Sequence, residues 1–463
     1  MLSKIRKGIL AMALAMAVPA IADTPKYIFY FIGDGMGPVA VNNAQIYKRT
    51  VKGDNTPLTM MRMPYGGLVT THSASSPVTD SAAAGTALAT GSKTKNGMLG
   101  MDADTVAVTS MAKILHKNGF GIGLVTTVAP DDATPAAFYA NVPNRGMFYE
   151  IGKDAAASGF EFLAGANLRG TRKKDGMPND LMKIIEESGM EVVRGTDAVK
   201  DVTSRRVLLL SPDTTSMNEV GLAIDSIAGA MLLPDMTQAC VDHLMKNSPE
   251  KFFMMVEGGS IDHAGHANDA ATSIMETINF DNALNVAYRF YEAHPEETLI
   301  VVTADHETGG LATANRNHHY WVDFTPLQYQ RISKDSFANW TRQEILSGRE
   351  FTWPEMKEII SDKLGLYTNI PVDEKEDARL QEMFDKNFRQ YKGEELKTLY
   401  NAYNEFCIEL FDYMSRISGV GWTTNDHSGA MVPLYSVGVG ADRISGTLDN
   451  TEIPGRILSV AGF

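Results

Sequence analysis

The residues with the clearest chemical potential surround a serine in the stretch VTDSAAAGTALATG, residues 78–91. Ser81 directly precedes an alanine-rich run, and alanine is the best helix former, while Thr79 and Asp80 are residue types that begin helices. A helix starting here directs free backbone N–H groups and its positive dipole end towards an anion such as phosphate. Ser81 is therefore a candidate nucleophile; the alternative is an inert serine in an ordinary capped helix.

Carboxylate and imidazole side chains recur where apolar runs of the sequence end. A single carboxylate at the end of a strand is commonplace as a cap or turn residue, but several strand ends carrying such groups indicate a shared site. These candidate site residues, all beside expected strands, are Asp34, Asp132, Thr134, Glu257, Asp262, His263, His266, Asp305, His306 and His427.

The donor types and spacings sort these residues into metal sites. Asp262 and His266 are four residues apart, so a helical turn places both on one face. His427 would complete three protein ligands with an open position, as catalytic zinc requires.

A second zinc ion would be served by the adjacent Asp305 and His306 together with Asp34 and Ser81. The oxygen-only set of Asp34, Thr134 and Glu257 suits magnesium, which prefers carboxylates, hydroxyls and retained waters. Asp34 would then bridge two ions.

Alternating apolar runs and helical patterns predict the scaffold. Helices are expected at 109–119 and 270–294, and the pattern is that of a mostly parallel sheet with helices on both faces, a three-layer α/β sandwich. Ligands bind beyond the carboxyl ends of such strands, where the candidate residues fall. The expected strands are 27–33, 66–71, 120–127, 206–211, 252–259, 298–306 and 434–440.

Composition and the first residues bound the class of protein. The 463 residues have a formal net charge of -14, which argues against general affinity for nucleic acid or anionic membranes. Residues 1–22 resemble a signal peptide, with basic residues, an apolar run and an A-x-A site ending at Ala22. We expect cleavage there and a periplasmic or secreted protein; the alternative is a retained anchor. Cys240 and Cys407 are expected to be free thiols rather than one bridge.

Six motifs in order carry a family resemblance: GDGMG, VTDSAAAGTALATGSKTKNG, DATPAA with a following Arg, VEGGSIDHAGH, TADHETGG and NDHSGAMVP. Together they resemble the alkaline phosphatase family over most of the mature chain. The resemblance implies a bacterial, secreted and usually homodimeric phosphomonoesterase with two zinc ions and one magnesium ion. It implies that Ser81 becomes phosphoserine, that Arg145 grips two phosphate oxygens, and that Asp80 orients Arg145.

The chemistry of the residues agrees with this implication. A serine hydroxyl is a weak nucleophile near neutral pH and needs a base or a metal. No Ser-His-Asp arrangement is apparent, so the second zinc would activate Ser81 while the first stabilises the leaving alkoxide. The planar guanidinium of Arg145 suits bidentate phosphate binding, which lysine cannot provide.

The chain departs from the family at two positions near phosphate. Some bacterial members carry Asp and Lys there and animal members carry His at both, whereas this chain has Asp132 and His263. We expect Asp132 to hold a magnesium-bound water and His263 to bind phosphate through water. Binding should then be weaker than with Lys, and product release faster.

Residues 312–425, within the expected domain 23–463, carry no family motif. They contain helical patterns at 373–391 and 394–418 and would form an inserted cap or crown segment, serving either substrate access or a dimer contact. His318 and His319 in this segment are expected in a solvated loop. The histidines without a metal-like context, assigned to packing or surface, are His72, His116, His243 and His294.

Three functions remain open from the sequence. The first is hydrolysis of small phosphate monoesters. The alternative within the superfamily is a phosphodiesterase or sulfate-ester hydrolase, although Arg145 and the magnesium set favour the monoester. The third, a non-catalytic phosphate- or metal-binding protein, requires a lost nucleophile or ligand, and none is lost.

Overall fold

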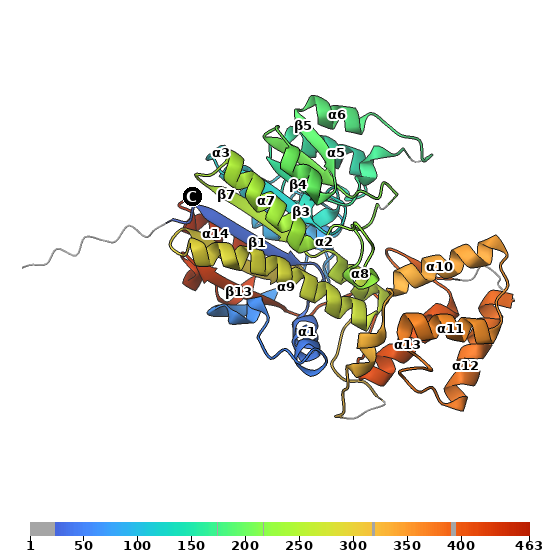
Figure 1. The fold of residues 1–463 in the computed structure, drawn as a ribbon. Coiled ribbons are helices and arrows are strands. Elements are labelled where there is room, and N and C mark those ends of the chain that lie inside the picture. The colour runs from blue at the N-terminus through green and yellow to red at the C-terminus, as the bar shows by residue number, and fades with distance from the viewer. Residues whose placement is uncertain (1–23, 174, 216, 317–319, 390–394) are drawn as a thin grey trace, which may run out of the picture.

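The computed structural model describes residues 24–463 except 174, 216, 317–319 and 390–394 (Figure 1). The expected signal peptide, 1–22, and the pair His318 and His319 therefore lie outside the described residues. Among the helices of the described part, none combines the length and apolarity needed to cross a membrane.

The main sheet has ten strands in the order β14-β2-β13-β8-β1-β7-β3-β4-β6-β5. Within it, β13 runs antiparallel to both neighbours, and all other pairs are parallel. The predicted α/β class with a mostly parallel sheet is confirmed. The strands are β1 (Tyr27–Gly33), β2 (Tyr65–Thr70), β3 (Gly121–Thr126), β4 (Phe162–Gly165), β5 (Met190–Arg194), β6 (Arg206–Leu210), β7 (Phe252–Glu257), β8 (Thr298–Ala304), β13 (Val432–Gly438) and β14 (Gly446–Asp449).

Three of these strands were absent from the sequence prediction. β5 and β14 lie at the two edges of the sheet, and β4 is only four residues long. Short strands and partly exposed edge strands lack the long apolar run that marks the central strands. The seven predicted strands all exist; β1 has the predicted ends, and the other six have one or both ends shifted.

Helices cover both faces of the sheet, because successive side chains of a strand point to opposite sides. On β1, Phe29 and Phe31 contact Phe290 and Phe280 of α9. Tyr30, between them, contacts Phe138 on the other face. Figure 1 shows α7 and α9 lying across one face. The helices are α1 (Pro38–Thr50), α2 (Ser81–Thr90), α3 (Met111–Lys117), α4 (Ala133–Ala136), α5 (Phe148–Ala157), α6 (Leu181–Glu187), α7 (Leu233–Asn247), α8 (Ser260–Ala267), α9 (Ala270–Ala293), α10 (Lys334–Ser347), α11 (Trp353–Leu364), α12 (Glu374–Phe384), α13 (Glu405–Ser418) and α14 (Glu452–Val460).

A second hydrophobic core is built by α10 to α13, which form a lobe at one end of the molecule (Figure 1). Phe337, Met356, Leu380 and Phe406, one from each helix, are fully buried in it. The expected inserted segment, 312–425, contains this lobe, but its limits as a unit stay a prediction.

The helix predicted over 394–418 is wrong in its first half. The described residues there form a hairpin of β10 (Leu396–Lys397) and β11 (Ala402–Tyr403), and α13 begins only at Glu405. The physical reason is that Asn404 caps α13 by accepting from the Cys407 N–H, while Thr398 and Asn401 close a turn. Side chains that bond to nearby backbone compete with the helix.

Both cysteines are buried and free, as predicted. Cys240 belongs to the core of the main sheet, whereas Cys407 belongs to the core of the α10–α13 lobe.

Candidate functional site

Ser81 is the first residue of α2, as the sequence predicted. The Asp80 carboxylate caps this helix by accepting a 3.0 Å hydrogen bond from the Ala83 N–H. The Ser81 side chain is almost fully buried, and its Oγ lies 3.2 Å from Nε2 of His306. The hydroxyl is therefore held at a helix N-terminus beside an imidazole that follows β8.

The residues predicted for the second zinc ion converge around His306. Its Nε2 lies 3.3 Å from Oδ1 of Asp34 and 3.2 Å from Oδ2 of Asp305. Asp34 follows β1 and Asp305 follows β8, and these adjacent parallel strands end at the same level, with Gly33 beside Ala304. The shared carboxyl edge of the strands thus brings the three groups together.

The GDGMG motif contributes a close backbone approach as well as Asp34. Gly35 has φ of 72° and donates its N–H to Asp305 over 3.1 Å. A Cβ at this glycine would lie 2.8 Å from Cα of Asp262. Glycine is therefore required for Asp34 and Asp262 to lie in one site.

The residues predicted for the first zinc ion also meet. Asp262 and His266 share one face of α8, and Nε2 of His266 lies 3.3 Å from Oδ2 of Asp262. His427 arrives on β12 (His427–Ser428), which pairs with β9 (Glu307–Thr308) immediately after His306. The rings of His306 and His427 consequently stack with centroids 3.5 Å apart.

Potential ligand atoms of two overlapping groups lie within 4.8 Å of one another: Asp262, His306 and His427, and Asp34, Asp305 and His306. His306 belongs to both, so the two predicted zinc sites adjoin at this ring. His266 reaches the first group through Nε2, 3.1 Å from Nε2 of His427.

The orientation of the imidazoles suits a cation. Nδ1 of His266 lies 2.5 Å from the Asn425 carbonyl and Nδ1 of His427 lies 2.8 Å from the Thr79 carbonyl. A carbonyl can only accept, so each Nδ1 carries a proton, and Nε2 of each ring faces into the site. Such backing bonds are how proteins orient histidine ligands of metals.

Three buried carboxylate oxygens complete this picture: Oδ1 of Asp34, Oδ2 of Asp262 and Oδ2 of Asp305 accept no hydrogen bond within the described structure. An imidazole nitrogen lies 3.2–3.3 Å from each. Unpaired buried carboxylates are costly, and a metal ion would compensate them. The donor set of imidazole and carboxylate fits zinc.

The oxygen-only set predicted for magnesium is also assembled. The Thr134 hydroxyl lies 3.4 Å from Oδ2 of Asp34, and Glu257, at the end of β7, accepts a hydrogen bond of 2.5 Å from Thr126. Asp34, Thr134 and Glu257 are all buried. Thr126, at the end of β3, was missed by the sequence reading.

Charge crowding is visible in the pKa values of this cluster. Burial and then Asp305 raise the pKa of Asp34 well above its ordinary value. Burial also raises the pKa of Glu257, to about 8. Burial would raise the pKa of Asp262 too, but His266 and other imidazoles hold it well below its usual range. The several carboxylates around Asp34 repel one another, and a bound cation would relieve this repulsion.

Arg145 lies between the carboxylates of Asp80 and Asp132. Its Nη1 is 3.3 Å from Oδ2 of Asp80, and its Nη2 is 3.1 Å from Oδ1 of Asp132. The two carboxylates hold the guanidinium beside Ser81, which directly follows Asp80 in the chain. This geometry supports the predicted orienting role of Asp80.

A second arginine, Arg169, was missed. Its Nη1 lies 3.0 Å from Oδ2 of Asp132, so this buried carboxylate lies between two guanidinium groups. Burial would raise the pKa of Asp132, but Arg169 and Arg145 lower it to about 2. Like other site residues, Arg169 follows the carboxyl end of a strand, β4. It was missed because that strand was not predicted.

His263 is held by two residues that the sequence reading did not identify. Its Nδ1 lies 3.1 Å from Oε2 of Glu219. The ring of Tyr400, from the turn between β10 and β11, lies with its centroid 3.8 Å from that of His263 and 5.3 Å from that of His266. Nothing in the sequence indicated that Tyr400 lies here, and the hairpin that carries it was predicted as part of a helix.

The four histidines assigned to packing or surface have other neighbours. His243 Nε2 lies 2.9 Å from the Arg205 carbonyl, and His116 lies 3.7 Å from Glu161. His72 and His294 lie 3.7 Å from Asp449 and Glu297 respectively.

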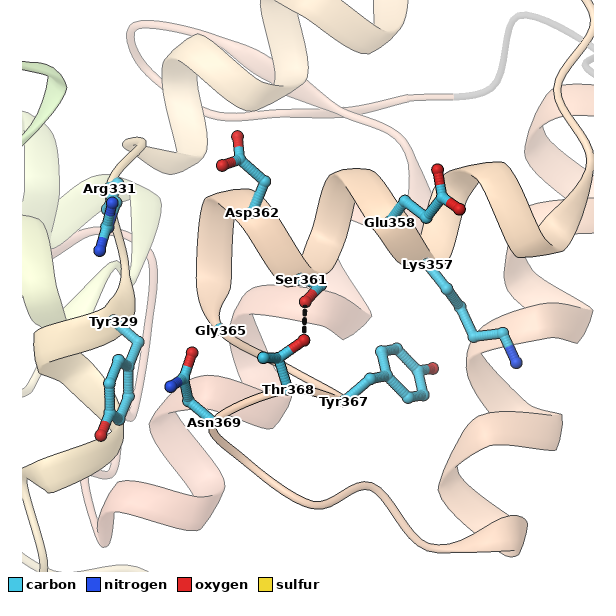
Figure 2. A pocket seen from close by; sticks show the side chains of 10 residues that line it. All are labelled: Tyr329, Arg331, Lys357, Glu358, Ser361, Asp362, Gly365, Tyr367, Thr368 and Asn369. Atoms are coloured by element: carbon cyan, nitrogen blue, oxygen red, sulfur yellow. Dashed lines mark hydrogen bonds between the residues drawn. The ribbon is translucent and has the colours of Figure 1, made fainter.

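A different pocket, of about 610 Å³, lies in the α10–α13 lobe and is drawn in Figure 2. Lys357, Ser361 and Asp362 of α11 line one side, and Tyr367 and Asn369 line another. In Figure 2 the Ser361 hydroxyl bonds to the Thr368 hydroxyl. The pocket shares no lining residue with the strand-end site, and the metal-like groups among the described residues lie elsewhere.

Comparison with known proteins identifies the family. A sequence model of the family described as "Alkaline phosphatase" matches residues 25–175 and 161–463. Alkaline phosphatase 4 of Bacillus subtilis is 30% identical over 94% of this chain and 88% of its own length. The repressible alkaline phosphatase of Saccharomyces cerevisiae is 28% identical over 96% and 82%.

Solved structures agree with the sequence relatives. A cold-active alkaline phosphatase from a psychrophilic Shewanella has a TM-score of 0.79 at 26% identity, covering 94% of this chain and 99% of its own. The Thermus thermophilus alkaline phosphatase has a TM-score of 0.77 at 25% identity, with 98% and 95% covered. The chain belongs to the alkaline phosphatase family, whose members hydrolyse phosphate monoesters.

Proposed function

We propose that this chain hydrolyses phosphate monoesters through a phosphoserine formed on Ser81, at a site that holds two zinc ions and one magnesium ion. The single observation that carries the proposal is the position of the Ser81 Oγ, 3.2 Å from His306 Nε2, where Asp34 and Asp305 also converge.

The residues sort into three sets by their donors. Asp262, His266 and His427 would hold one zinc ion, and Asp34, Asp305, His306 and Ser81 the second. Asp34, Thr134 and Glu257 would hold magnesium. When bound, these ions would supply positive charge that lowers the pKa of the serine and stabilises the leaving oxygen.

The chain's own residues then divide the work. The Ser81 oxygen attacks phosphorus and displaces the alcohol, forming a phosphate ester that water later cleaves. Arg145 donates two parallel N–H groups to phosphate oxygens, and Asp80 and Asp132 hold its guanidinium in place. His263, which Glu219 holds, would contact phosphate through a water molecule. Asp132 would bind a magnesium-bound water.

A monoester is favoured over the diester and sulfate alternatives by the concentration of positive groups. Arg145 and Arg169 both border the site, and the carboxylate cluster calls for further cations. A terminal phosphate carries more negative charge than a diester or a sulfate ester, so these positive groups would stabilise it most. Export to the periplasm or medium and a homodimer remain predictions.

The test is turnover of phenyl phosphate, its diester and its sulfate ester by the purified protein. Each is measured before and after chelation, and with zinc and magnesium restored. A large monoester preference that chelation abolishes and both metals restore is expected, together with a phosphorylated Ser81 peptide in acid-quenched samples by mass spectrometry. Better turnover of the diester, or indifference to chelation, would overturn the proposal.

A further inference from the structure

Tyr400, from the α10–α13 lobe, contacts two histidines of the site. It lies in the turn of the β10–β11 hairpin, which Thr398 closes by donating its N–H to the Asn401 carbonyl over 2.8 Å. Its ring is partly buried against His263 and His266. The part of the chain without family motifs thus touches the family site.

The hairpin is anchored so that the ring has a defined position. Asp335 of α10 accepts from the Asn401 amide over 2.9 Å and also from the Tyr403 hydroxyl. Arg342 of α10 donates to the Ala402 carbonyl over 2.6 Å and to the Asn401 side chain over 3.3 Å. These bonds to the three residues that directly follow Tyr400 pre-organise its position.

The ring contacts two histidines of α8, at the end of the imidazole series farthest from Ser81, and its hydroxyl also lies near Arg145. Ser81 adjoins His306, His306 stacks on His427, and His427 adjoins His266. Tyr400 contacts His266 and the neighbouring His263, beyond this series. In an in-line displacement the leaving oxygen departs opposite the attacking one. The Tyr400 ring therefore borders the space into which the leaving group extends.

The face of the Tyr400 ring lies against the imidazoles of His263 and His266. A neutral phenol presents a flat, amphipathic surface rather than a charge, which suits an aromatic group more than an anion.

We propose that Tyr400 is a specificity-determining residue, whose ring forms a wall for the leaving group and favours flat aromatic phosphate monoesters over small alkyl ones. The inference rests on the proposed phosphomonoesterase function and assigns the α10–α13 lobe a direct part in substrate choice. An offset-stacked aromatic pair adds roughly 2- to 10-fold in binding.

The experiment uses the metal-loaded protein and two matched ligand pairs. Inhibition constants are measured for phenylphosphonate and methylphosphonate, and kcat/KM for phenyl phosphate and ethyl phosphate. The variants are Tyr400→Leu, which removes the aromatic ring, and Tyr400→Phe, which removes only the hydroxyl. The control is Leu399→Ala, which alters the neighbouring exposed residue of the same turn.

Tyr400→Leu is expected to weaken phenylphosphonate roughly 3- to 10-fold and methylphosphonate less than twofold. Tyr400→Phe and Leu399→Ala should keep the wild-type ratio. Equal weakening of both phosphonates, or a full effect in Tyr400→Phe, would overturn the assignment. If Tyr400→Leu does not fold, Tyr400→Trp and Tyr400→Ser replace it, and the ratio must survive only in the former.

Failure of the underlying function is distinguishable from failure of this inference. If the wild type hydrolyses neither monoester and binds neither phosphonate, the phosphomonoesterase proposal fails. If it processes both but their ratio is insensitive to residue 400, only the role of Tyr400 fails.

Discussion

The Nε2 atoms of His266 and His427 lie 3.1 Å apart, and the Nδ1 atom of each ring faces a backbone carbonyl. Two lone pairs at this distance repel unless a cation or a proton lies between them. The backing carbonyls hold both rings in the orientation that a metal ligand needs.

Metal removal should therefore destabilise the fold as well as abolish activity. Binding to the native state alone adds about 2.7 kcal/mol at a free ion concentration of 100 Kd. We expect the Tm of the chelated protein to fall and to recover with zinc and magnesium, as measured by scanning calorimetry. His427→Ala should lose most of the zinc-dependent gain, whereas His72→Ala, at an exposed histidine, should keep it. A Tm that does not change on chelation would contradict the metal assignment.

The metal-free protein should lose stability as pH rises from about 4.5 to about 8. The pKa of Glu257 is raised by burial to about 8, so its folded form binds a proton that the unfolded chain releases near 4.5. Its stabilising contribution is complete below pH 4.5 and lost through pH 8.

Glu257→Gln removes this titration, so the free energy of unfolding should fall less between pH 4.5 and 8, by an amount on the order of a few kcal/mol. The measurement is urea unfolding at several pH values. Glu250→Gln, at an exposed position, is the control and should leave the slope unchanged. An unaltered slope in Glu257→Gln would show that this carboxyl is already ionised in the metal-free fold.

Removing the nucleophile, Ser81, should reduce activity far more than removing the phosphate-binding Arg145. We expect Ser81→Ala to lower kcat by about 10³-fold or more, because Ser81 supplies the hydroxyl that lies beside Nε2 of His306 at the start of α2. Arg145→Ala should lower kcat/KM by roughly 10- to 100-fold, mainly through KM. Arg145→Lys should rescue little, since lysine lacks the planar fork. The measurement is steady-state kinetics of each variant. A comparable loss of kcat in Ser81→Ala and Arg145→Ala would argue against a phosphoserine intermediate.

His263 tests the departure from the bacterial family pattern. His263→Lys places a compact cation beside Glu219 and near phosphate, so inhibition by inorganic phosphate should tighten about 10-fold and kcat should fall if product release limits turnover. His294→Lys, distant from the site, is the matched control. An unchanged phosphate inhibition constant would refute the assignment of His263.

Arg169 should act through Asp132. Arg169 is the first of the groups that oppose burial and hold the pKa of Asp132 near 2. That depressed pKa contributes stability above pH 3.8, which is lost as pH falls through about 2. In Arg169→Gln the loss should begin at a higher pH, seen as a raised acid-unfolding midpoint, and KM should rise several-fold. Arg169→Lys should retain most of both properties; identical behaviour of the two variants would mean that charge is not the cause.

Much of the site was predictable because it follows from local rules. Asp80, Ser81 and the alanines after them specify a capped helix with a hydroxyl at its first turn, and Asp262 and His266 share a helix face through their spacing. The carboxyl edge of parallel strands explains why Asp34, Glu257 and Asp305 meet. These inferences need only periodicity and sheet topology.

Other features depend on contacts between segments far apart in the chain. The carbonyl partners of His266 and His427, the second arginine on Asp132, and the arrival of Tyr400 from a misread hairpin carry no local signature.

The sequence by itself determined the fold class, the helix of Ser81, the set of candidate metal ligands and the free cysteines, because these depend on pattern and residue type. Only the tertiary structure decided which imidazole nitrogen faces inward, how Asp132 is held and which lobe residue borders the leaving group. The physical reason is that hydrogen-bond direction and ring contact are set by the relative placement of packed elements, which spacing along the chain does not specify.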